Sequence, residues 1–374
     1  MTTPKSCADI RRNLCRRCAA LQIPVSGIFE LTPRCNLGCE MCYIRLTSEQ
    51  MKPIGTEKSA EEWIALGKEA RDAGMVFLLI TGGEPTLRKD FPQIYRALAQ
   101  MGLSISINTN GTLITDEIKE VFKEFPPAQI NLTLYGVCRE DYTDFCKNGD
   151  AFDAVKDALR WFEAENILVH LNATFTPSNY SKWTKLEDFA KKRSLELRAT
   201  CYCFPPTRRS DCTDCKEFSR LTPEEAGSVM AEEILYRMGP EAIIRRAETL
   251  TSPLQKSCDL DNGEPMQCLA GRSQFWVAWE GSMTPCGMLS TPCTNPFNSN
   301  FKDAWAKLCN DVSGIRLCAE CNNCELQSTC MNCAAVTFAE TGRFDGKPEY
   351  MCQMIKSYRN KISALAERIK EKSQ

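Results

Sequence analysis

The sequence predicts an α/β fold, a partial (β/α)6 barrel followed by a smaller, cysteine-rich C-terminal domain. Between about residues 25 and 200, short apolar runs typical of strands alternate with amphipathic helical segments. After residue 258, cysteines become frequent and long periodic segments are absent until a final helix, expected at about 351–371. Repeated strand-helix-strand alternation predicts a parallel sheet with right-handed crossovers, because parallel neighbours need such connections.

Six segments are expected to form the strands of the barrel: 26–34, 76–81, 103–108, 130–135, 167–175 and 195–200. Their side chains alternate between apolar and polar; Leu103, Ile105 and Ile107, for example, sit opposite Ser104, Ser106 and Asn108. A closed barrel fills its interior with branched apolar side chains. A polar inner face therefore predicts an open TIM-type barrel that holds a polar ligand. The alternative is a sheet with one solvated face, which parallel sheets rarely have.

Helix start signals fall between these strands and after them. Ser59 and Glu62 form a capping box, and Asp150 precedes an apolar pattern of helical period. Thr222 caps a helix expected to reach about Arg237. The expected division is an N-terminal extension, the barrel, a bridging region and the C-terminal domain: 1–24, 25–200, 201–257 and 258–374.

Composition narrows the class of protein. Lys plus Arg number 46 and Asp plus Glu 48, so no overall charge attracts nucleic acid or an anionic membrane. No run approaches the roughly 18 apolar residues of a membrane span, and the N-terminus lacks the apolar core of a signal peptide. We expect a cytoplasmic protein with neither partner. In a reducing compartment, 23 cysteines indicate metal binding or catalysis rather than disulfides.

Three cysteines lie within eight residues in the segment CNLGCEMC: Cys35, Cys39 and Cys42. Three thiolates cannot complete the four-thiolate shell of a [4Fe–4S] cluster, so one iron stays open. An open position on a metal is what a substrate or cofactor fills.

With Tyr43 after it and a strand before it, this segment resembles the signature of the radical S-adenosylmethionine (SAM) superfamily. The resemblance implies that the open iron chelates the amino and carboxylate groups of SAM. An electron from the cluster then releases a 5′-deoxyadenosyl radical, which abstracts hydrogen. It makes Cys35, Cys39 and Cys42 the catalytic cluster ligands and Tyr43 a cofactor-binding residue.

Further segments at strand ends match the same family. TGGEPTL is similar to its Gly-Gly-Glu-Pro segment, which implies contacts to the methionine amino group from Gly82, Gly83, Glu84 and Pro85. NTNGTL resembles a turn beneath SAM and gives Asn108 and Asn110. TLYG places Tyr135 where many relatives have Asp, which leaves ribose contacts there open. Thr133 and Arg198 are also expected to bind the cofactor; for Arg198, a pair with Glu196 is the alternative.

The C-terminal cysteines resemble the SPASM domain, with a gap of two residues before Cys333 where three are common. The resemblance implies two auxiliary [4Fe–4S] clusters, three clusters in all. Auxiliary cluster I would use Cys258, Cys268, Cys286 and Cys333. Auxiliary cluster II would use Cys321, Cys324, Cys330 and Cys352. Cys318 is a spare thiol near the second set, and structural zinc is the alternative for some of these cysteines.

Several residues stay open at this stage. Two groups outside these motifs either bind metal or are reduced thiols: Cys201, Cys203, Cys212 and Cys215, and Cys7, Cys15 and Cys18. His170, the only histidine, is expected to be a hydrogen-bonded residue of the barrel interior rather than a base.

SPASM relatives act mostly on peptides, which makes maturation of a ribosomally made precursor the leading interpretation. The modification would be a thioether or carbon–carbon crosslink, an epimerisation or an oxidation. An electron donor such as flavodoxin or ferredoxin is implied. Because only about 24 residues precede the first strand, a separate leader-binding protein is expected. Formylglycine formation is one alternative, although Gly287 stands where sulfatase maturases carry an Asp. Oxidation of a small molecule and a non-catalytic electron-transfer protein are the others.

Overall fold

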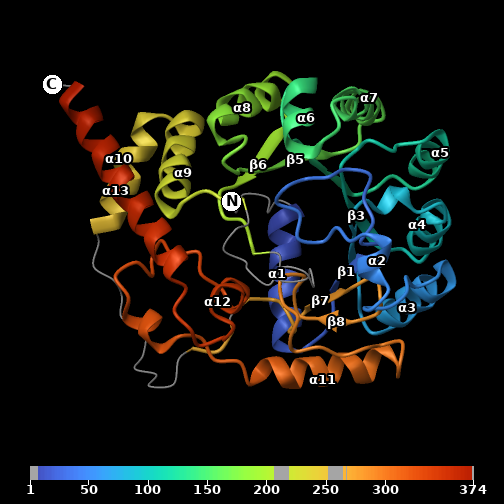
Figure 1. The fold of residues 1–374 in the computed structure, drawn as a ribbon. Helices are drawn as coiled ribbons and strands as arrows, with labels where there is room; N and C mark the ends of the chain where they lie inside the picture. The colour runs from blue at the N-terminus through green and yellow to red at the C-terminus, as the bar shows by residue number, and fades with distance from the viewer. Residues whose placement is uncertain (1–6, 206–218, 252–263, 267, 373–374) are drawn as a thin grey trace, which may run out of the picture.

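The computed structural model describes residues 7–205, 219–251, 264–266 and 268–372. Its centre is an eight-stranded sheet in the order β6-β5-β4-β3-β2-β1-β7-β8 (Figure 1). The six predicted barrel strands are present and parallel: β1 (Ser26–Glu30), β2 (Phe77–Thr81), β3 (Ser104–Thr109), β4 (Gln129–Thr133), β5 (Val169–Thr174) and β6 (Glu196–Thr200). The sheet is not closed, since β6 and β8 form its edges.

The C-terminal part of the chain contributes two strands to the same sheet. β7 (Gln274–Val277) runs parallel to β1, and β8 (Met283–Thr284) returns antiparallel to β7 as a hairpin. The sequence suggested the hairpin but not its attachment to the barrel. The sheet therefore continues across the division that we expected between 25–200 and 258–374.

Helices cover the outer face of the barrel strands (Figure 1). They are α3 (Ala60–Asp72), α4 (Phe91–Gln100), α5 (Asp116–Glu124), α6 (Arg139–Cys146), α7 (Ala151–Ala164) and α8 (Trp183–Lys192). The capping box is confirmed: Ser59 accepts from the Glu62 backbone N–H, and the Glu62 carboxylate accepts from the Ser59 N–H. The apolar strand residues Ile105 and Leu132 are buried in one core with Trp63 of α3. Short turns α2 (Ser48–Met51), η1 (Pro85–Leu87) and η2 (Tyr180–Lys182) lie in the connections.

A second helical layer joins the bridging region to the end of the chain. α9 (Pro223–Met238) begins at the predicted Thr222 cap and packs with α10 (Pro240–Thr251) and α13 (Glu349–Lys372). Gly227 permits a close crossing, because a Cβ there would lie 2.4 Å from the carbonyl oxygen of Met354. The final helix was predicted within two residues at each end.

The expectation of little regular structure after residue 258 is wrong. α11 (Phe301–Ser313) buries Phe301, Trp305 and Leu308 at helical spacing, and η3 (Ala319–Asn323) and α12 (Ala334–Thr341) follow it. The N-terminal extension also contains a helix, α1 (Cys7–Ala20). The sequence pattern of α11 was readable, but the cysteine density around it obscured the signal.

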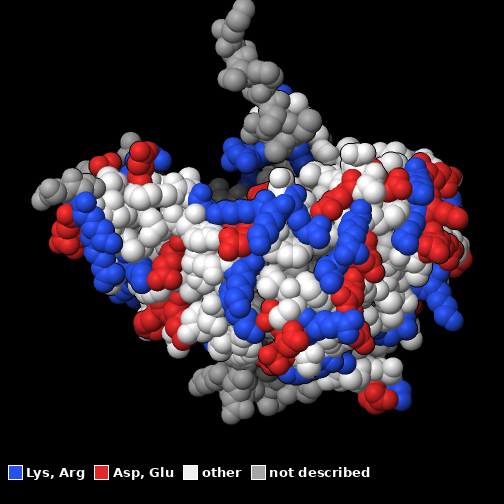
Figure 2. Space-filling view, turned by 90° about the horizontal axis from the view of Figure 1, so that it is seen from above, with Lys and Arg blue, Asp and Glu red and all other residues white. Residues whose placement is uncertain are grey.

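Charge on the molecule is mixed. On the face drawn in Figure 2, Lys and Arg side chains intermingle with Asp and Glu and form no broad area of one sign. Among the described residues, none of the helices combines the length and the apolar character that a membrane span requires.

Candidate active site

A cavity of about 380 Å³ lies where the barrel strands end. The cysteine loop after β1 and the loops after β2 and β3 form one side of it. Polar side chains on the inner face of the strands form another: Thr81, Asn108, Thr133, Asn172, Thr174 and Thr200. The predicted polar inner face thus lines a cavity rather than a solvated surface, at the strand ends where parallel α/β folds bind ligands.

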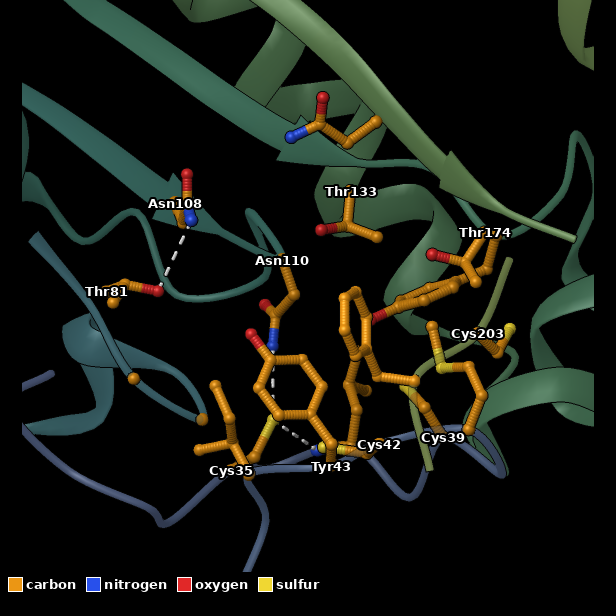
Figure 3. A pocket seen from close by; sticks show the side chains of 18 of the residues that line it. Cys35, Cys39, Cys42, Tyr43, Thr81, Asn108, Asn110, Thr133, Thr174 and Cys203 are labelled. Atoms are coloured by element: carbon orange, nitrogen blue, oxygen red, sulfur yellow. Dashed lines mark hydrogen bonds between the residues drawn. The ribbon is translucent and has the colours of Figure 1, made fainter. Parts of the chain in front are cut away.

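The three cysteines of the loop all line this cavity (Figure 3). Backbone N–H groups point at two of their sulfurs: Leu37 donates to Cys35 at 3.4 Å and Arg45 donates to Cys42 at 3.2 Å. The Asn110 side chain donates to the Cys35 sulfur at 3.6 Å. Such donors stabilise negative charge on thiolates and on the sulfurs of a cluster. This set of thiols fits a [4Fe–4S] cluster with one open iron.

Burial raises the pKa of Cys35 to about 12, so the free thiol keeps its proton. The pKa of Cys39 is raised further, first by a hydrogen bond with Cys146 and then by burial. The Tyr135 hydroxyl opposes this shift by hydrogen bonding to Cys39. Coordination to iron would deprotonate these thiols, since metal binding releases protons from its ligands. Tyr135, where relatives commonly have Asp, therefore touches a cluster ligand.

The Glu84 carboxylate is completely buried and holds two loops together. It accepts hydrogen bonds from the Thr86 N–H (3.1 Å) and hydroxyl (2.6 Å), the Thr109 hydroxyl (2.8 Å) and the Asn110 N–H (2.7 Å). Neither Glu84 nor Pro85 lies on the cavity wall among the described residues. In this structure Glu84 therefore positions the turns after β2 and β3, where the sequence predicted a contact with the cofactor.

Gly82 and Gly83 do line the cavity, and both approach a neighbouring backbone closely. A Cβ at Gly82 would lie 2.5 Å from the Thr32 carbonyl oxygen, and one at Gly83 would lie 2.4 Å from that of Arg34. Only glycine fits this approach of the β2 loop to the cysteine loop.

The other predicted cofactor-binding residues divide into two groups. Tyr43, Asn108, Asn110 and Thr133 line the cavity (Figure 3). Arg198 is exposed, donates to Glu196 at 3.1 Å and is not among the residues that line the cavity. The alternative weighed for Arg198, a pair with Glu196, is the arrangement that the structure shows.

His170 lies outside the cysteine-lined cavity, with Nδ1 3.5 Å from the Glu196 carboxylate. Burial lowers its pKa. The structure therefore keeps the only histidine away from the cysteine loop.

Several lining residues were not singled out from the sequence. Asn172, Thr174 and Thr200 follow the strand alternation and were within reach of that signal. Tyr202 and Phe204 follow β6, and Met288 comes from the C-terminal domain, so no local pattern predicts them. Cys203 also lines the cavity and donates weakly to the Phe175 carbonyl at 3.6 Å.

The remaining candidate cysteines are only partly described. Cys15 and Cys18 are buried on α1 against Val25 and Phe77, which is a packing role. Cys201 is buried in the main core. Cys212 and Cys215 lie outside the described residues, as does Cys258.

A second cavity, of about 140 Å³, lies in the C-terminal domain. It gathers the four cysteines assigned to auxiliary cluster II and one more: Cys321, Cys324, Cys330, Cys352 and Cys318. The Leu326 N–H donates to the Cys324 sulfur and the Asn332 N–H to the Cys330 sulfur, both at 3.4 Å. These bonds repeat the pattern of the first cysteine loop and fit a cluster of thiolates.

The set assigned to auxiliary cluster I is less complete. Cys286 packs in a small apolar cluster with Met266 and Ala334. Burial and, to a smaller extent, the nearby Cys333 thiol raise the pKa of Cys268. In the described part of the chain, no three His, Cys, Asp or Glu side chains converge closely enough to hold a single metal ion.

Comparison with known proteins identifies the barrel. Residues 29–190 match the family described as the radical SAM superfamily. The chain therefore contains a radical SAM domain and is a radical SAM enzyme, as the cysteine loop predicts.

Relatives and solved structures extend the comparison over the whole chain. An AdoMet-dependent heme synthase from Methanosarcina barkeri is 26% identical over 84% of this chain and 93% of its own. A PqqA peptide cyclase from Rhizobium meliloti is 27% identical over 46% of each chain. Streptococcus suis SuiB bound to its precursor peptide SuiA covers 94% of this chain and 82% of its own, with a TM-score of 0.66 and 17% identity. Native anSMEcpe with bound AdoMet covers 93% of this chain and 100% of its own, with a TM-score of 0.66 and 18% identity. These two structures share the fold of the barrel together with a SPASM-type C-terminal domain.

Proposed function

We propose that this enzyme modifies a peptide, a ribosomally made precursor, by radical chemistry started in the cavity at the strand ends. When bound, SAM and the cluster at Cys35, Cys39 and Cys42 would supply a 5′-deoxyadenosyl radical that abstracts hydrogen from the substrate. One observation carries the choice of substrate class. No Asp, Glu, Lys, Arg or His is found among the described residues that line the cavity.

An uncharged wall favours an uncharged ligand segment. Amide and hydroxyl side chains such as Asn108, Asn172 and Thr174 can pair with the N–H and C=O groups of a peptide backbone. Tyr202, Phe204 and Met288 offer apolar surface to its side chains. SuiB, which has the same fold, is described as bound to a precursor peptide, and one relative is named a peptide cyclase.

Heme synthesis is the second candidate, because relatives of that name match most of this chain. Porphyrins carry carboxylate groups, and proteins recognise carboxylates best with Arg. The described lining offers no such cation. The same argument disfavours a nucleoside triphosphate, although some relatives are named GTP 3′,8-cyclases.

Formylglycine formation needs a general base near the substrate. Position 287 has none, and a Cβ there would lie 2.7 Å from ring atoms of Trp276. Since the described lining contains no carboxylate elsewhere, the structure favours another peptide modification.

The proposed cofactors are SAM and three [4Fe–4S] clusters, one at the cysteine loop and two in the C-terminal domain. The proposed partners are a one-electron donor, flavodoxin or ferredoxin, and a separate leader-binding protein.

The test uses the full chain, reconstituted anaerobically with iron and sulfide and supplied with SAM and a chemical reductant. Short peptides encoded beside the gene and an iron porphyrin are compared as substrates. We expect 5′-deoxyadenosine release to be coupled to a mass change in a peptide and to be absent in Cys39→Ala. Turnover of the porphyrin with no peptide modified would reject the proposal in favour of the second candidate.

A further inference from the structure

The cavity of the C-terminal domain holds one thiol more than a cluster needs. A [4Fe–4S] cluster takes four thiolates. Five cysteine side chains line this cavity, and the fifth, Cys318, is absent from the ligand pattern of the SPASM domain. The inference below rests on the auxiliary clusters of the proposed function.

Cys318 is placed as a ligand would be. It is the residue that begins η3, its side chain is buried, and the residue as a whole is only 4% exposed. The Cys321 N–H donates to the Cys318 carbonyl at 3.1 Å, which closes a 3₁₀ turn. In such a turn, side chains three residues apart lie over one another. The thiols of Cys318 and Cys321 are accordingly in hydrogen-bond contact.

The other cysteines of the cavity are held separately. Cys324 and Cys330 each accept a backbone N–H on sulfur, and these bonds fix the two thiols. Cys352 comes from the first turn of α13, on a different element. The redundancy is therefore confined to the neighbours Cys318 and Cys321.

We propose that Cys318 is an alternative iron ligand that can replace Cys321 at one iron of auxiliary cluster II. In the exchange, the Cys318 thiol loses its proton as its sulfur binds iron, and the Cys321 thiolate takes up a proton as it leaves. No electron is transferred, so the exchange needs no oxidant or reductant.

The experiment counts iron in a background that lacks the first cluster, Cys35→Ala/Cys39→Ala/Cys42→Ala. After anaerobic reconstitution this protein should hold about eight irons in two clusters. Adding Cys321→Ala should leave about eight, because Cys318 completes the shell. Adding Cys324→Ala, which has no neighbouring substitute, should leave about four. The pair Cys318→Ala/Cys321→Ala should also leave about four.

Electron paramagnetic resonance of the reduced proteins gives a second readout. The signal of auxiliary cluster II should persist in Cys321→Ala with shifted g-values and vanish in the double variant. Circular dichroism of each protein before reconstitution checks that a loss of iron is not a loss of fold. The proposal is overturned if Cys321→Ala loses iron as fully as Cys324→Ala, or if the background binds no iron. Release of 5′-deoxyadenosine by the unmodified chain separately tests the radical chemistry.

Discussion

Gly287 lies flat against the indole ring of Trp276, so that a Cβ at position 287 would come within 2.7 Å of three ring atoms. The Trp276 indole N–H donates in turn to the buried Glu30 carboxylate at 3.0 Å. The ring is thereby held between the start of the C-terminal domain and β1. No side chain can enter at position 287 unless Trp276 moves.

Gly287→Asp should therefore destabilise the fold without supplying a base. We expect a loss of about 1–3 kcal/mol in the free energy of unfolding, the usual cost of overpacking. Chemical denaturation under anaerobic conditions measures it. Gly314→Ala is the matched control, because a Cβ there meets nothing nearer than 3.6 Å. Equal stability of the Gly287→Asp protein and the wild type would show that Trp276 yields, and a base at 287 would again be feasible.

Glu84→Gln should destabilise the protein even without cluster or SAM. The carboxylate accepts from two backbone N–H groups, and an amide nitrogen cannot accept, so at least one buried donor loses its partner. The expected loss is about 1–3 kcal/mol, measured by denaturation of the apoprotein. Exposed Glu120→Gln on α5 serves as the control and should change stability by less than about 0.5 kcal/mol. If Glu84→Gln kept full stability and lost only SAM affinity, the carboxylate would belong to the cofactor site.

Tyr135→Phe should shift the reduction potential of the first cluster to a more negative value. Burial raises the pKa of Tyr135, so its hydroxyl keeps its proton and can donate to the Cys39 sulfur. A hydrogen bond to a ligand sulfur favours the reduced cluster, because reduction adds negative charge. A potentiometric titration followed by paramagnetic resonance reads the shift. Tyr95→Phe, which loses a hydrogen bond to the Phe125 carbonyl far along the chain from the cysteine loop, should leave the potential unchanged. An unchanged potential in Tyr135→Phe would mean that its hydroxyl does not act on the cluster.

Glu233 on α9 should make stability fall as the pH rises through neutrality. Burial raises its pKa to about 7; Arg237 opposes the shift and Glu187 adds to it. An acid whose pKa is higher in the folded protein stabilises the fold below its unfolded pKa, near 4.3, and loses that contribution as pH rises to about 7. The difference is on the order of 2–4 kcal/mol between pH 4 and pH 8. Glu233→Gln should flatten this part of the stability profile, whereas neighbouring Glu232→Gln, at an exposed ion pair with Lys361, should not. Parallel profiles for wild type and Glu233→Gln would exclude a raised pKa.

Local pattern was sufficient for most of the barrel. The six parallel strands, the Ser59 and Thr222 helix caps and the final helix follow from the spacing of apolar residues and from capping side chains, which act over a few residues. The cysteine loop and the glycines after β2 were also readable, because short motifs at strand ends must meet at one edge of a parallel sheet. α11 carried the same kind of signal and was missed.

What only the tertiary structure decided depends on contacts between distant segments. The pairing of β7 with β1 joins residues about 250 positions apart, and no local pattern specifies such a partner. Whether a polar side chain faces a ligand or another protein group is decided in the same way. Glu84 and Arg198 both looked like cofactor contacts in the sequence. The fold satisfies the first with four internal hydrogen bonds and leaves the second exposed beside Glu196. Sequence alone determined which chemical groups this enzyme carries, and long-range packing determined which of them its cavity presents.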